Sequence, residues 1–159
     1  MDLYSLRFDD AQGESKLRSM RTAVEAQEPL MPRIDGMRVL LVEDEPDARE
    51  FLAELLASRG AAVDVAGSVA EAYERLGEAV PDVIVSDIGM PVVDGYQFAR
   101  ELRSLPTERG GRTPLVALTA FTAPQDRRRA FDAGYDQHLS KPVDTDELVR
   151  VIERLVAPG

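Results

Sequence analysis

The chain of 159 residues contains no cysteine, which excludes a disulfide framework and a metal site built on thiolates. It also lacks any run of 18 apolar residues and any charged-then-apolar segment typical of a signal peptide. We therefore expect a soluble, cytoplasmic protein that makes no membrane contact. A chain of this length can bury a core in one domain and still leave an extra segment.

Positive charge is scarce, with 19 lysine and arginine residues against 29 aspartate and glutamate residues, for a net charge of −10. Such a chain repels phosphate backbones and anionic lipid, so direct binding to nucleic acid is not expected. Three arginines are consecutive at 127–129, and we interpret them as a solvated helix face. Only two lysines and one histidine occur, and one of these lysines, Lys141, closely follows His138.

From Met37 onward, short aliphatic runs alternate with longer amphipathic stretches. This alternation predicts repeated strand–helix units around a parallel sheet, and right-handed crossovers favour a doubly wound α/β arrangement. The five expected strands are residues 37–43, 62–66, 82–87, 114–119 and 135–139.

Helix start and stop signals fall between these strands. The first expected helix begins near Pro46 and stops at Gly60. Ser68, with Glu71 three residues later, predicts a capped start for the second helix. The apolar stripe of the first helix comprises Phe51, Leu52, Leu55 and Leu56. The other three helices are expected at 95–105, 124–133 and 144–156.

Residues 1–35 lie outside this pattern, and we interpret them as a linker or mobile N-terminal arm before a domain spanning 36–159. Residues 14–27 carry apolar side chains at helical spacing, so this segment can form a short amphipathic helix that Pro29 and Pro32 would end. The alternative is an arm that packs on a partner or on a second copy. The small apolar area of the segment favours the linker.

Four of the expected strands run into residues that carry chemistry. Asp87 is the most informative, because it closes a strand suited to burial on both faces and precedes a loop rich in glycine and proline. Since the carboxyl ends of parallel strands meet at one edge of an open sheet, these residues are expected to lie together. They are Glu43 and Asp44, Asp87, Thr119 and Ala120, and Lys141.

The order and approximate spacing of these groups resemble the receiver domains of two-component response regulators. The match runs from about Gly36 to the C-terminus and includes Met90-Pro91 and Asp94-Gly95 after Asp87. The resemblance implies a flavodoxin-like receiver fold, with a five-stranded parallel sheet in the order 2-1-3-4-5. It also implies that the Lys141-Pro142 peptide bond can be cis.

By this resemblance, Asp87 is the nucleophile that accepts a phosphoryl group as an aspartyl phosphate. Three carboxylates in one pocket repel one another, so the cluster calls for a cation, and Mg²⁺ suits oxygen ligands with phosphate. The family pattern implies that Asp44 and Asp87 bind Mg²⁺ directly, that Glu43 binds it through water, and that Gly89 supplies its backbone carbonyl. The alternative for Glu43 and Asp44 is that they only favour the dipole of the helix that follows.

The remaining site residues are expected to hold the phosphoryl oxygens. Lys141 would contact one oxygen, for which a compact ammonium is preferred over the broad guanidinium of arginine. The Thr119 hydroxyl and the backbone N–H of Ala120 would donate to another oxygen. Thr119 could instead cap its loop and Lys141 could be a solvated amine.

The resemblance further implies a signalling receiver that catalyses only its own phosphorylation and dephosphorylation. The phosphoryl donor would be a histidine kinase or a phosphotransfer protein. The response would reach a downstream protein target through the face formed by the fourth helix, the fifth strand and the fifth helix, and a homodimer is left open. The chain would be a stand-alone regulator or the receiver of a hybrid histidine kinase.

His138 departs from the family pattern, because receivers usually carry tyrosine or phenylalanine at this position. One hypothesis is that the imidazole is the rotating part of the switch and fills space that Thr119 vacates. The other is that His138 only packs in its strand, where intermediate burial is ordinary for histidine.

Two other functions share this class of fold. A haloacid-dehalogenase-type Mg²⁺-dependent phosphatase also uses a strand-end aspartate, but it needs a general acid two residues later, where Gly89 stands. A flavodoxin-like or dinucleotide-binding module holds phosphate on its first loop, and here Glu43-Asp44-Glu45 would repel it. Both alternatives therefore conflict with named residues.

Overall fold

The structure, a computed structural model, describes residues 31–90, 94–120 and 123–156. Five parallel strands form one sheet in the order β2-β1-β3-β4-β5, which confirms the predicted doubly wound order. The strands are β1 (Arg38–Val42), β2 (Ala62–Ala66), β3 (Val83–Asp87), β4 (Leu115–Thr119) and β5 (Gln137–Ser140). The predicted N-terminal helix at 14–27 lies outside the described residues. The compact unit described below is Arg33–Gly159.

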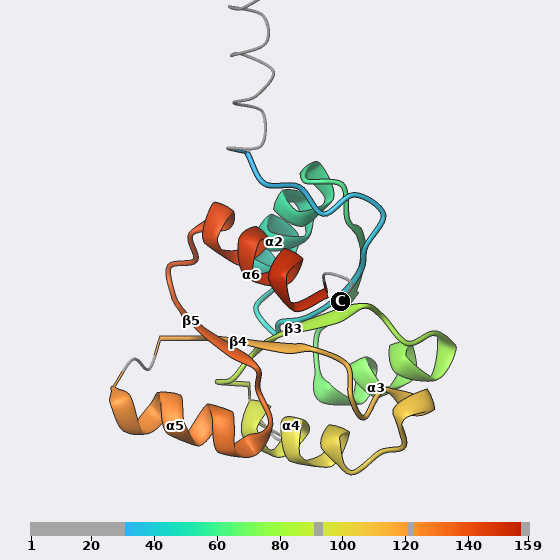
Figure 1. The fold of residues 1–159 in the computed structure, drawn as a ribbon, viewed down its shortest axis with the longest axis vertical. Coiled ribbons are helices and arrows are strands. Elements are labelled where there is room, and N and C mark those ends of the chain that lie inside the picture. The colour runs from blue at the N-terminus through green and yellow to red at the C-terminus, as the bar shows by residue number, and fades with distance from the viewer. Residues whose placement is uncertain (1–30, 91–93, 121–122, 157–159) are drawn as a thin grey trace, which may run out of the picture. The chain divides into compact units, whose positions relative to one another are not determined.

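Helices cover both faces of the sheet (Figure 1). They are α2 (Pro46–Ser58), α3 (Val69–Glu78), α4 (Gly95–Arg103), α5 (Pro124–Ala133) and α6 (Thr145–Val156), with a 3₁₀ turn at Thr107–Arg109. Helices α2 and α6 pack on one face, and α3, α4 and α5 pack on the other. Every residue of β3 and β4 is buried, which explains why these strands are nearly continuous aliphatic runs. No helix in the described part of the chain is long and apolar enough to cross a membrane.

The local signals for helix ends agree with the structure. Pro46 occupies the first turn of α2, and the Ser68 hydroxyl accepts a hydrogen bond from the Glu71 N–H at the start of α3. The Glu71 carboxylate in turn accepts from the N–H of Gly67, just before the N-cap. The side chains of Ser68 and Glu71 therefore satisfy two backbone N–H groups at the start of α3. Gly60, just after α2, has a φ of 99°, a conformation that favours glycine.

The predicted apolar stripe of α2 is wrong at Phe51. Leu52 and Leu56 are buried, whereas Phe51 is 61% exposed. Adjacent residues on a helix are rotated by about 100°, so a helix whose buried line passes through Leu52 and Leu56 turns Phe51 toward solvent.

The fifth strand begins two residues later than predicted, because Tyr135 and Asp136 belong to the turn that enters it. The Asp136 N–H donates to the Leu115 carbonyl, and the Asp136 carboxylate accepts from the Leu115 N–H, both at 2.8–2.9 Å. Asp136 therefore pairs with the start of β4 before the β5 ladder begins.

Arg103, the last residue of α4, forms hydrogen bonds with the segments that lead into β4 and β5. Its guanidinium donates to the backbone carbonyls of Gly111, Thr113 and Gly134 and to the Asp136 carboxylate, at 2.7–3.1 Å. The side chain is only 24% exposed. Arg103 thus links the segment before β4 to the segment before β5.

We predict that Arg103→Lys lowers the free energy of unfolding by about 2 kcal/mol, because an ammonium cannot replace the planar fork and leaves carbonyls without donors. Urea unfolding measures this change. Arg100→Lys is the matched control, since Arg100 is exposed on the same helix. Equal unfolding midpoints for the two variants would contradict the structural role of Arg103.

Candidate functional site

The carboxyl ends of the strands bring the predicted residues to one edge of the sheet. Asp87 is the last residue of β3 and lies in register with Leu118 of β4, and Thr119 is the last residue of β4. Val42, at the end of β1, pairs with Ser86, so Glu43 and Asp44 leave β1 beside Asp87. The parallel arrangement therefore gathers the acidic pair, Asp87 and Thr119, although Asp44 and Asp87 are 43 residues apart and Asp87 and Thr119 are 32 residues apart.

Three carboxylates form the centre of this edge. Each of Glu43, Asp44 and Asp87 offers an oxygen atom, and these oxygens lie within 4.8 Å of one another. Glu43 is 1% exposed, Asp87 is 7% exposed, and Asp44 is half-buried. Like charges held this close in a partly dry pocket repel strongly, so the cluster depends on positive charge nearby.

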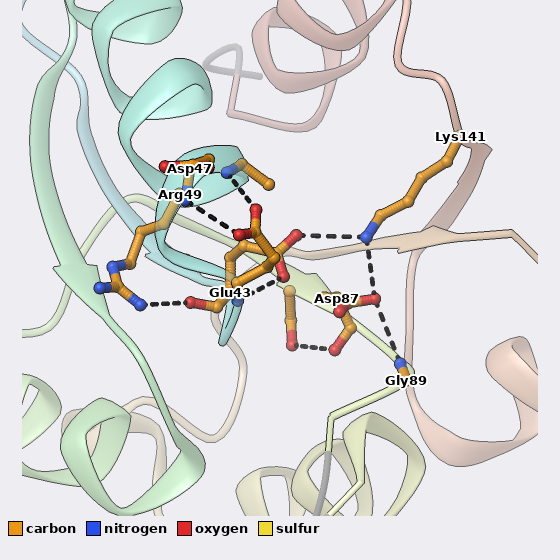
Figure 2. Close-up of polar contacts among 9 residues, drawn as sticks. Glu43, Asp47, Arg49, Asp87, Gly89 and Lys141 are labelled. Carbon is orange, nitrogen blue, oxygen red and sulfur yellow. Dashed lines mark hydrogen bonds and ion pairs between the residues drawn. The ribbon is translucent and has the colours of Figure 1, made fainter.

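Lys141 supplies positive charge from the other side of the sheet edge. Its Nζ atom lies 3.2 Å from Oε1 of Glu43 and 3.3 Å from Oδ1 of Asp87, so one ammonium bridges the two carboxylates (Figure 2). Lys141 follows β5, and its backbone N–H donates to the Thr119 carbonyl at 2.9 Å. The Lys141-Pro142 peptide bond is cis. The lysine is therefore a half-buried member of the acidic cluster, and the solvated alternative does not hold.

The pKa values follow this arrangement. Burial raises the pKa of the Glu43 carboxyl, the charge of Asp87 raises it further, and the Glu45 N–H and Lys141 act against these effects. Burial acts to lower the pKa of Lys141, but the charges of Asp87 and Glu43 outweigh burial and raise it. Lys141 therefore stays protonated, and its single charge faces three acids.

The arrangement of donors suits a hard divalent cation. All three acidic groups offer oxygen, and one ammonium leaves the negative charge of three carboxylates only partly balanced. The backbone N–H of Gly89 donates to Oδ1 of Asp87 at 3.2 Å, which orients the carboxylate at the mouth of the site. The acidic cluster can therefore bind a metal ion.

Glu45, which the sequence analysis named only as part of an acidic run, and Arg49, which it did not name, support the acidic pair. Glu45 is the N-cap of α2, and its carboxylate accepts from the N–H groups of Asp47 and Ala48. Arg49 donates from Nη1 to the Glu43 carbonyl at 3.0 Å (Figure 2). The Glu45 N–H also donates to the Glu43 carboxylate at 3.3 Å, so Glu43 contacts the start of the helix as well as Lys141. The signal that could have found this cap was Glu45 directly before Pro46.

Thr119 and His138 lie on the face of the sheet opposite α2, and Ala120 follows Thr119. Thr119 is 1% exposed, while Ala120 is exposed and begins the loop after β4. His138 is buried in β5 in register with Ala117, whose side chain belongs to the core under α3, α4 and α5. Alternation along β4 places Thr119 on the same face as Ala117, so His138 and Thr119 share one face of the sheet.

His138 also reaches the outer surface of the fold. It lines an open pocket of about 470 Å³ with residues of α5, β5 and α6, among them Arg127, Leu139 and Val151. Thr119 ends β4 and pairs with Ser140 of β5, two residues after His138. Only a short stretch of β5 therefore separates the site from this pocket. His138 is therefore placed between the strand-end cluster and an external surface.

Comparison with known proteins agrees with this geometry. The family model for the response regulator receiver domain matches residues 39–153. Response regulator Rre1 from Synechocystis is 42% identical over 124 residues, which cover 77% of this chain and 53% of Rre1. Probable histidine kinase 2 from Oryza sativa is 35% identical over 133 residues, which cover 75% of this chain and 13% of the kinase. The chain thus spans about half of one relative and a small part of the other.

A solved structure extends the comparison to the site. The receiver domain of the sensor histidine kinase PA1611 from Pseudomonas aeruginosa, solved with a magnesium ion coordinated in the active-site cleft, is 34% identical and has a TM-score of 0.70. The match covers 77% of this chain and 99% of that domain. With the family model matching most of the chain and the strand order in agreement, this chain belongs to the family of response regulator receiver domains.

Proposed function

We propose that Asp87 accepts a phosphoryl group from a phosphohistidine and that the acidic cluster holds Mg²⁺ for this transfer. The observation that carries the proposal is the bridge from the Lys141 ammonium to Glu43 and Asp87, at 3.2 and 3.3 Å, beside a third carboxylate. A strand-end carboxylate between an ammonium and a metal-binding pair is equipped to become an acyl phosphate.

In this proposal Asp44 and Asp87 bind the ion directly, Glu43 binds it through water, and the Gly89 carbonyl completes the protein ligands. The three acids match the oxygen preference of Mg²⁺, and the magnesium-bound PA1611 domain supports the choice of ion. When bound, Mg²⁺ supplies neutralisation of negative charge on a phosphoryl oxygen.

The chain's own residues then perform the transfer. An Asp87 carboxylate oxygen attacks phosphorus in line, a new P–O bond forms, the P–N bond to the donor imidazole breaks, and the electron pair stays with that imidazole. The Lys141 ammonium shifts from the Asp87 carboxylate to a phosphoryl oxygen. The Thr119 hydroxyl and the Ala120 N–H donate to another oxygen, and the small Ala120 side chain leaves the acceptor accessible.

The partners follow from the family. The donor is a histidine kinase or a phosphotransfer protein, and the presence of receivers within histidine kinases allows the donor to be part of the same polypeptide. The surface made by α5, β5 and α6, which includes the pocket beside His138, contacts a downstream protein or a second copy when Asp87 is phosphorylated. The protein acts in the cytoplasm as a signalling module whose only chemistry is its own phosphorylation and dephosphorylation.

Asp87→Asn is expected to abolish labelling by acetyl phosphate, because the amide is not a nucleophile for phosphorus. Labelling of the unmodified chain is expected to require Mg²⁺ and to stop in EDTA. Intact-mass measurement reads both results. Asp132→Asn, an exposed acid on α5, is the matched control and should label normally. Full labelling of Asp87→Asn, or labelling unaffected by EDTA, would refute the assignment.

Asp44→Asn is expected to weaken Mg²⁺ binding at least tenfold, because it removes one charged ligand. In EDTA the same variant should melt at the same temperature as the unmodified chain or higher, since one of three crowded carboxylates is gone. Calorimetric titration with Mg²⁺ and thermal melts measure the two effects. Asp47→Asn, in the first turn of α2, is the control. A clear loss of stability in EDTA would make Asp44 structural.

His138→Ala is expected to leave Asp87 phosphorylation intact but to uncouple it from the α5, β5 and α6 surface, because the buried imidazole lies between Thr119 and the external pocket. Amide NMR shifts on phosphorylation, followed on those elements, test this expectation. Gln137→Ala, at the neighbouring position of the same pocket, is the control. If the shifts of His138→Ala match those of the unmodified chain, histidine only packs.

A further inference from the structure

A buried tyrosine lies behind the phosphoacceptor strand. Tyr135, in the turn that enters β5, is only 3% exposed, and its hydroxyl donates to the backbone carbonyl of Gly95 at 2.9 Å. Gly95 is the first residue of α4, the helix that follows the Asp87 loop. The phenol therefore joins the approach to β5 with the start of α4, 40 residues away in sequence.

Gly95 sits where three parts of the chain converge. Its N–H donates to the Ile88 carbonyl at 2.9 Å. A β-carbon added at Gly95 would lie 2.6 Å from the Ile88 α-carbon, 2.9 Å from the Asp87 carbonyl oxygen and 2.9 Å from the Tyr135 hydroxyl. No side chain fits in this space without displacing backbone. The two ends of the loop after Asp87, Ile88 and Gly95, are thus held together, and the Tyr135 hydroxyl packs against the same point. We call this arrangement of Ile88, Gly95 and Tyr135 the clamp.

A hydrogen bond from Ser86 holds the Asp87 carbonyl next to this clamp. The Ser86 hydroxyl is fully buried and donates to the Asp87 carbonyl at 3.1 Å. Burial raises the pKa of the Tyr135 hydroxyl above its ordinary range. The phenol therefore keeps its proton at working pH and remains a donor to Gly95. Tyr135 and Ser86 thus donate to two different carbonyls, those of Gly95 and Asp87, at the same point of the chain.

We propose that Tyr135 is a positioning residue for the Asp87 carboxylate, acting through the Gly95 carbonyl and the hydrogen bond from Gly95 to Ile88. The proposal rests on the function assigned to Asp87 above. The Gly89 N–H donates to Asp87 Oδ1 at 3.2 Å, and Gly89 directly follows the clamped Ile88. Holding Ile88 and Gly95 together therefore sets the direction of Asp87 and of the Gly89 backbone at the same time.

The competing explanation is that the hydroxyl only satisfies a buried carbonyl and stabilises the fold. Both explanations predict some loss of stability when the hydroxyl is removed, since each buried hydrogen bond contributes to folding. Only the positioning role predicts a change in Mg²⁺ affinity and in phosphorylation rate at temperatures where the variant is fully folded. These two measurements therefore separate the explanations.

The test compares Tyr135→Phe with Tyr73→Phe in the full chain. Tyr73 also donates its hydroxyl to α4, to Glu101 at 2.9 Å, but it is half-buried and makes this contact outside the clamp. Tyr135→Phe is expected to slow labelling by acetyl phosphate about tenfold and to weaken Mg²⁺ binding several-fold, because small displacements of a reacting group are costly. Tyr73→Phe is expected to change neither quantity.

Tyr135→Phe with unchanged labelling and Mg²⁺ affinity overturns the proposal, whatever happens to its melting temperature. If Tyr135→Phe does not fold, Ser86→Ala provides the same two readouts and the same criterion, since it releases the Asp87 carbonyl that packs against Gly95 in the clamp. Failure of the proposed function is a different result, because the unmodified chain would then not label at Asp87. In that event Mg²⁺ affinity alone still decides whether Tyr135 positions the carboxylate.

Discussion

Repulsion among Glu43, Asp44 and Asp87 is the constraint around which this fold is arranged. The parallel sheet directs three carboxylates to one edge, and their oxygens lie within 4.8 Å of one another. Within the described residues, Lys141 is the amine that contacts this cluster, and it balances only part of the charge. The excess negative charge therefore favours an added cation at this edge. Under the proposed function, a phosphoryl group is itself anionic, so its binding would depend on that cation and on Lys141.

The surrounding structure holds the acids in place against this repulsion. Glu45 caps α2, and Arg49 fixes the Glu43 carbonyl, so the acidic pair rests on a defined helix start. On the other side, the hydrogen bond from Gly95 to Ile88 closes the loop after Asp87. These contacts use backbone groups, so the positions of the carboxylates depend on the chain path more than on side-chain packing.

Local signals predicted the parallel α/β sheet and the gathering of Glu43, Asp44 and Asp87 at one edge, because aliphatic runs and strand-end polar groups can be read along the chain, whereas the strand order came from the family resemblance. The sequence analysis missed contacts that depend on tertiary structure. Arg103 reaches carbonyls before β4 and β5, and no local pattern indicates those partners. Phe51 was placed inside because its helix has four neighbouring apolar residues, and only packing decides which two are buried. Tyr135 was taken as the first strand residue, which hid its contact with Gly95.

The short segment from Tyr135 to Lys141 contacts three regions that belong to different elements of the fold. Tyr135 touches the backbone near Asp87, His138 faces the pocket beside α6, and Lys141 contacts the Asp87 carboxylate. Because β5 is an edge strand, it pairs only with β4 in the described sheet, so it can shift without breaking a second ladder. In the proposed function, a phosphoryl group on Asp87 that draws Lys141 toward it would therefore pull on a strand that lies at the edge of the sheet. Under the proposed function, β5 would be the direct mechanical route from Asp87 to the surface of α5, β5 and α6.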